Sequence, residues 1–364
     1  MSIGTEITRL ADAKSAIATA IAGKGVTVPD GTKLDGMAAL INSIANQAEL
    51  ESITVKTPPT KLDYISGDTF DATGLVLTVL VGEVEIDITS GYIITPEIMA
   101  ADTTVVTISF TAGGKTVSTT QAVNVVHYST TFANNTWEKI VEACNLGLAQ
   151  TLWAVGDVSP AIELYGQSIA FRIVAFDHDS LSTSDSKYND ASYNNGSKKA
   201  IMTLETVNTL VGDGSPYSRA GFAYNANLSG GKAYWTNSTL KKTILPAILA
   251  LFPKSLSGSI RTVQKKTQSG PWESSLVSTN DQLFVLSQDE IFSRNAGEGT
   301  RYSYYQAGNS PAKTKADGST SGYWLRGPYP NDNYNNQVGL VNVSGQVVSA
   351  GGSGPHPLSF GFCI

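Results

Sequence analysis

The sequence predicts a multidomain protein, with a short α-helical segment over residues 1–50, an all-β sandwich over 51–127 and an α+β domain over 128–364. Three observations predict this order. The chain has 364 residues, more than one ordinary domain contains. The spacing of apolar residues changes from steps of three and four to steps of two near residue 51. After residue 127, helical and strand patterns are mixed and joined by long polar segments.

Composition and charge limit the classes of function. Charged residues make up 15% of the chain, against about 25% in ordinary soluble proteins, and glycine occupies 34 positions. The net charge of -6 argues against a nucleic-acid partner, because phosphates are neutralised by a basic face. No apolar run approaches the length of about 20 residues that spans a bilayer. The first residues also lack the pattern of a signal peptide. We therefore expect that the protein does not insert into a membrane and that it is made and assembled in a cytoplasm.

The first 50 residues carry two apolar stripes with helical spacing, separated by glycines and Pro29. The first stripe consists of Ile7, Leu10, Ile17 and Ile21, interrupted by Lys14. The second consists of Leu34, Met37, Ile41 and Ile44. Two short amphipathic helices are therefore predicted. So small a pair cannot bury both stripes by itself, and we expect each stripe to pack against a neighbouring subunit or particle.

Residues 51–127 alternate apolar residues with Thr, Ser or charged residues, as in "SITVKT", "LVLTVLVG" and "TVVTISFTAGGKTVSTT". This period of two predicts short antiparallel strands. Gly113 and Gly114 stand where a tight hairpin requires positive φ. Five or more short strands within about eighty residues indicate a small sandwich.

The last part of the chain opens with a helix signal. Asn135 or Thr136 is a candidate N-cap, and Gly147 is a candidate stop. The apolar face of this helix comprises Trp137, Ile140, Val141 and Cys144. A second helix is predicted over "STLKKTILPAILALF", with Pro246 kinking or breaking it. Short strands are predicted in "IAFRIVAFDHD", "SIRTVQKKT", "DQLFVLSQDEIF", "GYWLRGP", "QVGLVNVSGQVV" and "LSFGFCI".

Two groups of ionisable residues are candidates for chemistry. In "AFDHDSL", Asp177 and Asp179 flank His178, a combination that binds metals or transfers protons. Consecutive strand residues point to opposite faces, so we expect a turn or a structural polar network instead. Asp289 and Glu290 would suit an acid and a base, but their position favours capping or ion pairing.

Other catalytic and metal-binding signatures are missing from the sequence. There is no GxSxG motif, and Cys144 and Cys363 are too few for a disulfide framework or a cysteine zinc site. We expect two free, buried thiols. Calcium is an alternative at "NDNYNN", where Asp332 and several Asn offer oxygen ligands, but one carboxylate binds the cation weakly. We therefore predict no metal and no cofactor.

The large apolar side chains are expected to form the core. The residues concerned are Trp153, Trp235, Trp272 and Trp324. In "GYWLRG", Arg326 is expected to fix a loop by hydrogen bonds.

The chain resembles three kinds of known sequence. The ordered series "WAVGD", "IAFRIVAFDHDSL", "YWTNSTLKK", "IRTVQKKT", "QLFVLSQDEIF", "EGTRYSYYQ", "GYWLRGP" and "FGFCI" is similar to an uncharacterised bacterial and phage domain family. That family is related to C-type lectins and formylglycine-generating enzymes. Residues 51–126 resemble bacterial immunoglobulin-like modules, and the first helical segment resembles the start of phage tail proteins.

The resemblance implies a phage structural protein on the tail or surface of the virion. The N-terminal helices would contact other virion proteins, the immunoglobulin-like module would act as a spacer, and the C-type-lectin-like domain would bind a protein or glycan on the host surface. It implies a homo-oligomer, by analogy a trimer, and no enzymatic activity.

The last two polar stretches, "GPYPNDNYNN" and "SAGGSGPHP", are the predicted binding loops. Tyr contributes a stiff, amphipathic contact surface, while Asn, Ser and Gly provide adaptable hydrogen bonds, as in antibody loops. Some phage proteins of the resembling fold are diversified by retroelements that change Asn codons to Tyr, Asp, His, Ser or Gly codons. The residues that match this set are Tyr329, Asn331, Asp332, Asn333, Tyr334, Asn335, Asn336, Ser349, Gly351, Gly352, Ser353 and His356.

Three alternatives stay open. In the first alternative, the two stretches are ordinary polar loops. In the second, the protein is a virion decoration or spacer that binds nothing specific. The third is an enzyme that acts on cell-surface glycans or proteins. The reactive cysteine pair of the sulfatase-modifying relatives and the calcium-binding Pro and Trp-Asn-Asp motifs of sugar-binding lectins are missing from the sequence.

Overall fold

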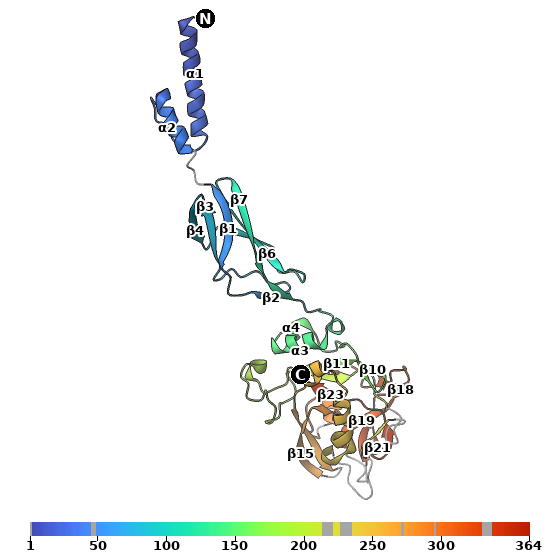
Figure 1. Cartoon of the computed structure of the whole chain (residues 1–364). Coiled ribbons are helices and arrows are strands. Elements are labelled where there is room, and N and C mark those ends of the chain that lie inside the picture. Colours follow the sequence, from blue (N-terminus) through green and yellow to red (C-terminus); the bar gives the residue numbers. More distant parts are fainter. Residues whose placement is uncertain are drawn as a thin grey trace. The chain divides into compact units, whose positions relative to one another are not determined.

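The computed structural model of the chain divides into two compact units, Met1–His127 and Tyr128–Ile364 (Figure 1). It is a mixed α/β protein with a helical N-terminus and many small, mostly antiparallel sheets, which confirms the predicted mixture of elements. The structure describes residues 2–44, 49–212, 221–225, 235–270, 273–294, 296–329 and 337–364.

The predicted helices of the first unit are present as α1 (Ile3–Ala22) and α2 (Leu34–Ile44). The Ser2 side chain caps α1 by accepting a hydrogen bond from the Thr5 N–H. The two helices pack against each other and bury Ile21 and Met37. The first two residues of the first stripe stay open to solvent, with exposed fractions of 62% at Ile7 and 56% at Leu10, and Ile3 at the start of α1 is 83% exposed.

The strands of the first unit form two three-stranded sheets. One has the order β1 (Leu50–Thr57), β3 (Val76–Val81), β4 (Val84–Ile88), and the other β5 (Tyr92–Thr95), β6 (Val105–Ala112), β7 (Lys115–Ala122). Both sheets contribute to a single hydrophobic cluster that includes Ile53, Leu77 and Ile108. A short parallel pair adds β2 (Asp63–Ile65) and β8 (Asn124–Val126).

Positive φ angles of 58° at Gly113 and 79° at Gly114 form the tight turn between β6 and β7. This confirms the hairpin predicted there, because glycine adopts this conformation without a steric penalty.

The helices of the second unit are short. The Thr136 side chain caps α3 (Trp137–Asn145), and Gly147, with φ of 73°, follows its end as predicted. A π-helical turn, η4 (Leu240–Ile244), passes without interruption into α5 (Leu245–Leu249), so Pro246 lies in the first turn of α5 and does not break the helix. The remaining helical segments are η1 (Phe132–Asn134), α4 (Ala149–Leu152), η2 (Tyr193–Gly196), η3 (Trp235–Asn237), α6 (Lys254–Ser257), α7 (Gln288–Phe292) and α8 (Ser303–Gln306).

The largest sheet of the second unit has the order β11 (Phe171–Phe176), β12 (Met202–Thr206), β23 (Gly361–Cys363), β16 (Leu283–Phe284). The end of the chain therefore lies inside this sheet. Aromatic rings from three parts of the chain pack on it, with ring centroids 5.0 Å apart for Phe171 and Phe362 and 5.6 Å apart for Phe252 and Phe362.

Smaller sheets surround this core. The hairpin of β14 (Val263–Gly270) and β15 (Glu273–Asp281) is one, and the three-stranded sheet of β19 (Tyr323–Pro328), β20 (Gln337–Val341) and β21 (Val347–Gly351) is another. The two-stranded sheets pair β9 (Ile162–Leu164) with β10 (Gln167–Ile169), β13 (Phe222–Ala223) with β22 (Pro355–His356), and β17 (Lys313–Thr314) with β18 (Thr320–Ser321).

One predicted strand is partly wrong. In "DQLFVLSQDEIF", Leu283–Phe284 is a strand, but Gln288–Phe292 forms α7. The Ser287 side chain accepts from the Glu290 N–H, and the Glu290 side chain accepts from the Ser287 N–H. This reciprocal capping box begins a helix, and it outweighs the apolar pattern that favoured a strand.

Predictions about the core are confirmed where the structure describes the residues. Trp153, Trp235 and Trp324 are buried, whereas Trp272 lies outside the described residues. Cys144 and Cys363 are buried free thiols.

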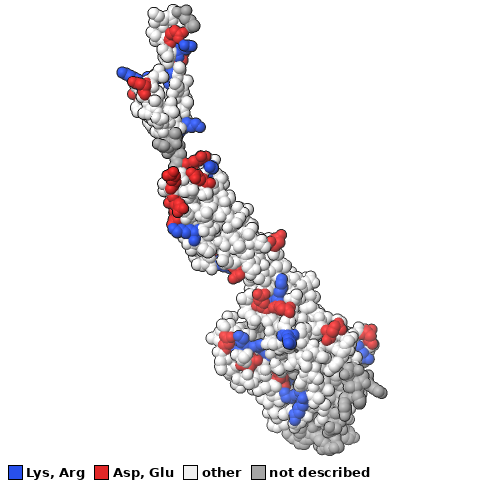
Figure 2. Space-filling view, in the orientation of Figure 1, with Lys and Arg blue, Asp and Glu red and all other residues white. Residues whose placement is uncertain are grey.

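The surface carries few charges, as the composition indicates. Figure 2 shows small groups of acidic and basic side chains on a largely uncharged surface, on the side in view. Within the described residues, no helix has both the length and the apolar character needed to cross a membrane.

Candidate functional site

The three-stranded sheet of the second unit brings the two predicted binding stretches together. The first stretch begins with the last two residues of β19, Gly327 and Pro328, and β20 begins directly after the stretch at Gln337. Gln337 pairs with Gly351, the last residue of β21. The second stretch therefore leaves the sheet beside the point where the first returns to it. We call this end of the sheet, comprising Tyr329, Gln337, Gly351 and the turn 352–354, the sheet tip.

The structure places the predicted site residues unequally. Tyr329 is half-buried, and its N–H lies 3.5 Å from the carbonyl oxygen of Gln337. Ser349 on β21 and Ser353 in the following turn are exposed, and Gly351 is half-buried. The predicted residues that lie outside the described part of the chain are Asn331, Asp332, Asn333, Tyr334, Asn335 and Asn336.

Two of the predicted residues take part in packing. Gly352 is buried, and its carbonyl oxygen accepts from the Asn225 N–H at 2.9 Å. His356 pairs with Phe222, and its ring meets the Trp324 ring edge-on at 4.8 Å. Burial lowers the pKa of His356. In the second stretch, therefore, the side chains of Ser349 and Ser353 are exposed, while Gly352 and His356 hold the backbone against the core on either side of Ser353.

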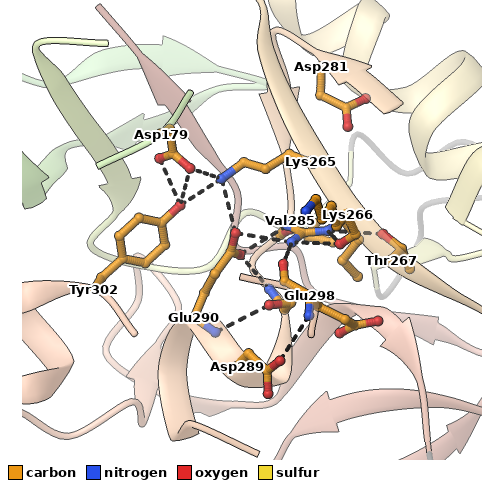
Figure 3. Close-up of polar contacts among 12 residues, drawn as sticks. Asp179, Lys265, Lys266, Thr267, Asp281, Val285, Asp289, Glu290, Glu298 and Tyr302 are labelled. Carbon is orange, nitrogen blue, oxygen red and sulfur yellow. Dashed lines mark hydrogen bonds and ion pairs between the residues drawn. The ribbon is translucent and has the colours of Figure 1, made fainter. Parts of the chain in front are cut away.

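A network of buried charges lies beneath β19 (Figure 3). Arg326 is fully buried and donates two hydrogen bonds of 3.0 Å to the two carboxylate oxygens of Glu290. Lys265 donates to Glu290 at 3.0 Å, to the Tyr302 hydroxyl at 2.8 Å, and to Asp179. We call these five residues the charge network. They come from five separate segments of the chain, which the network ties together.

Both carboxylates of the charge network favour the ionised form. Burial by itself would raise the pKa of Asp179, but Lys265 and His178 outweigh burial and hold that pKa below its ordinary value. Burial likewise opposes ionisation of Glu290, and Arg326 and Lys265 lower its pKa on balance. Buried charges that are paired and hydrogen-bonded in this way stabilise one arrangement of the chain.

Arg326 also fixes the loop that precedes α8. It donates to the carbonyl oxygens of Val285 at 2.8 Å and Glu298 at 3.0 Å. Asp289 accepts from the N–H groups of Ala296 and Glu298 at 3.0 and 2.9 Å. The predictions that Arg326 fixes a loop and that Asp289 and Glu290 serve capping or ion pairing are confirmed.

Glu298 is a buried acid for which burial outweighs the neighbouring positive charge. Burial raises its pKa to about 7, although Arg326 acts in the opposite direction. One carboxylate oxygen accepts from the Gln268 N–H at 2.9 Å. The carboxylate also lies against Gly327, where an added Cβ would come within 2.4 Å of it. Only glycine fits at this position, which is the first residue of the first predicted binding stretch.

A cleft opens beside this acid. It has a volume of about 370 Å³, and its lining includes His178, Lys266, Glu298 and Thr300. The His178 Nε2 lies 2.8 Å from the Thr300 hydroxyl, and the His178 ring contacts the Tyr302 ring at a tilt of 44°, with 4.3 Å between centroids.

Asp177 lies apart from His178 and Asp179, which contact each other with 3.6 Å between the His178 Nδ1 and the Asp179 Oδ1. Asp179 belongs to the charge network, His178 faces Thr300, and Asp177 accepts from Asn194 at 2.6 Å. This confirms the expected structural polar network. Among the described residues, no group of three or more His, Cys, Asp and Glu side chains is arranged to hold a metal ion.

Lys265 and Tyr302 lie in ordinary polar segments, and no motif in the sequence distinguishes them. One feature of the sequence does distinguish Glu298. It stands between Gly297 and Gly299, and glycine on both sides of a charged residue is typical of close backbone approach.

Comparison with known proteins adds a family match without a function. Residues 199–356 match a family model described as "Domain of unknown function (DUF6273)". The match extends from just before β12 to His356. It includes the first predicted binding stretch, the second as far as His356, and four of the five members of the charge network: Lys265, Glu290, Tyr302 and Arg326. No curated protein matches the chain.

Proposed function

We propose that the protein is a phage structural protein, an adhesin of the virion tail or surface, whose C-terminal unit binds a protein or glycan on the host surface through the sheet tip. The register of β20 and β21 carries this proposal, because Gln337 opposite Gly351 brings two separate polar stretches to one place. The finer assignments follow the same reasoning: a bacterial immunoglobulin-like spacer and a C-type-lectin-like binding domain. Retroelement diversification of the two stretches is part of the proposal.

The residues next to the sheet tip are held rigidly, and this supports a role of the two stretches in ligand recognition, as opposed to that of ordinary polar loops. Arg326 stands three residues before Tyr329 and is held by Glu290 and three backbone carbonyl oxygens. Side chains that project from such a base keep their positions when neighbouring residues change. The same arrangement, variable polar and tyrosine side chains on a fixed scaffold, serves antibody recognition.

The N-terminal helices support assembly. Ile3, Ile7 and Leu10 remain exposed on α1, and burial of such side chains is favourable by roughly 1.5–3 kcal/mol each. We propose that this surface contacts other copies, as a homotrimer, or other virion proteins. Several linked copies would multiply weak contacts with the host surface.

Binding of the labelled full chain to a panel of bacterial strains tests the proposal. The variant Ser349→Tyr/Ser353→Tyr changes two exposed side chains near the sheet tip. We expect it to weaken binding to a bound strain by about tenfold or more, while the free energy of unfolding changes by about 0.5 kcal/mol or less. Fluorescence of bound cells and chemical denaturation provide the two measurements.

The matched control is Ser344→Tyr. Ser344 is exposed in the turn between β20 and β21, at the opposite end of the same sheet. It should bind as the unchanged protein does. If both variants lose binding equally, the recognition site lies elsewhere. If the unchanged protein binds none of the strains, a decoration or spacer protein is favoured.

A further inference from the structure

A second cavity of the C-terminal unit shares no residue with the sheet tip, the charge network or the cleft beside Glu298. It has a volume of about 420 Å³, within the range of small-molecule sites. It lies between the end of α3, the start of α4, the residue after β11 and the segment 192–195. Its lining consists of Cys144, Asn145, Leu146, Gly147, Ala149, Gln150, Asp177, Ser192, Asn194, Asn195 and Ile201.

Amide side chains dominate the polar lining. Asn194 and Gln150 donate through their amide nitrogens to the two carboxylate oxygens of Asp177, and this use of the nitrogens leaves both amide oxygens as acceptors. The amides of Asn145 and Asn195 form no hydrogen bond with a residue in the described part of the chain. The cavity therefore presents several donors and acceptors close together.

The backbone around the cavity adopts conformations that non-glycine residues seldom occupy. Asp177, Asn194 and Asn195 have positive φ angles of 49°, 46° and 54°. Such conformations cost free energy and persist where surrounding contacts fix them, and they concentrate at ligand sites. Here the bond between Asn194 and Asp177 joins two of the three, so the polar lining is fixed in position.

The lining selects a class of ligand by charge. It contains no Lys, Arg or His, so an anionic ligand would find no opposite charge. It contains one carboxyl group, Asp177, which would hold a hard cation weakly. It has no aromatic ring on which a base or another aromatic group would stack.

The remaining lining is apolar or unreactive. The exposed side chain of Leu146 offers an apolar surface, and the buried Ala149 and Ile201 complete the apolar lining. Burial raises the pKa of the Cys144 thiol to about 12, so the thiol stays protonated and does not act as a nucleophile. The site is therefore suited to reversible binding.

We propose that this cavity binds a neutral sugar without the help of a cation. Each hydroxyl group of a sugar both donates and accepts, as do the neighbouring amides of Asn145, Gln150, Asn194 and Asn195, and its C–H faces match the small apolar surfaces. This site does not depend on the function of the sheet tip. A variant that no longer attaches to cells through the sheet tip should still bind the sugar in this cavity, and a variant that no longer binds the sugar should still attach.

Saturation-transfer NMR on the full chain tests the site with glucose, galactose, mannose and N-acetylglucosamine at millimolar concentration, in buffer containing EDTA. We expect at least one of these sugars to bind. Asn145→Ala and Gln150→Ala should each weaken that binding by about tenfold, since each removes hydrogen bonds to the ligand. Gln264→Ala, an exposed amide that lines the cleft beside Glu298, is the matched control and should leave binding unchanged.

Thermal unfolding of each variant shows whether it is folded, and exposed Asn145 is the safer of the two positions. The proposal is overturned if none of the four sugars binds, if binding appears only when calcium replaces EDTA, or if folded Asn145→Ala and Gln150→Ala bind as well as the unchanged protein.

Discussion

Arg326 illustrates what one buried side chain contributes when all its partners are fixed. Its guanidinium group meets both carboxylate oxygens of Glu290 and the carbonyl oxygens of three segments. The planar, forked donor geometry of arginine suits this role, and lysine could not replace it. The sequence indicated a loop-fixing role for Arg326 but not its partners, because Glu290 lies 36 residues away along the chain.

Glu298 should make stability depend on pH. Its pKa is about 7 in the folded protein, against an ordinary value of 4.5, so folding favours its protonated form. Its contribution is therefore fully present below about pH 4.5 and is lost as the pH rises through about 7. The free energy of unfolding of the C-terminal unit should fall by up to about 3 kcal/mol across this range from Glu298 alone.

Urea denaturation between about pH 5 and about pH 8 measures this dependence. Glu298→Gln removes the titrating group and should flatten this part of the profile. Glu163→Gln, at the exposed position of β9, serves as the control, and its free energy of unfolding should fall with pH as in the unchanged protein. An identical fall in both variants would show that another group is responsible.

Among the elements, α7 shows where periodicity and local capping disagree. Its apolar residues fit a short strand, but Ser287 and Glu290 are spaced for a capping box. The same spacing places Glu290 where Arg326 and Lys265 reach it. If the capping-box spacing is given more weight than the alternation of apolar residues, the sequence predicts both the helix and the orientation of Glu290.

The exposed stripe of α1 predicts self-association. Ile7→Ser/Leu10→Ser should shift the full chain from oligomer to monomer, because it removes apolar area that only another molecule can cover. Light scattering coupled to size-exclusion chromatography measures the mass.

Thr8→Ser/Asp12→Ser changes exposed positions off the apolar stripe of the same helix and should leave the mass unchanged. If the unchanged protein is already a monomer, the stripe contacts a different protein and not another copy.

At the scale of the whole molecule, the division at His127 predicts two independent folding units. Each unit has its own set of strands and its own buried side chains. A fragment of residues 128–364 should unfold in one transition at the temperature of the matching transition of the full chain, because domains with separate cores unfold separately. Differential scanning calorimetry makes this comparison. A shift of the transition by more than about 8 °C would show that the first unit stabilises the second.

The sequence by itself determined the local features of this protein. Apolar spacing predicted α1, α2 and the strands of the first unit, and single residues predicted the cap at Thr136 and the turn at Gly113. These features depend on neighbours within a few positions, so a short window contains their cause.

Only the tertiary structure decided which distant residues meet. Asp179 and Tyr302 are 123 residues apart, yet their hydrogen bond helps to close the charge network. The pairing of Gln337 with Gly351 and the bond between Asp177 and Asn194 form the two candidate binding sites. Contacts of this kind arise from strand register and from the packing of buried side chains, which depend on the whole fold and leave no pattern in a short window.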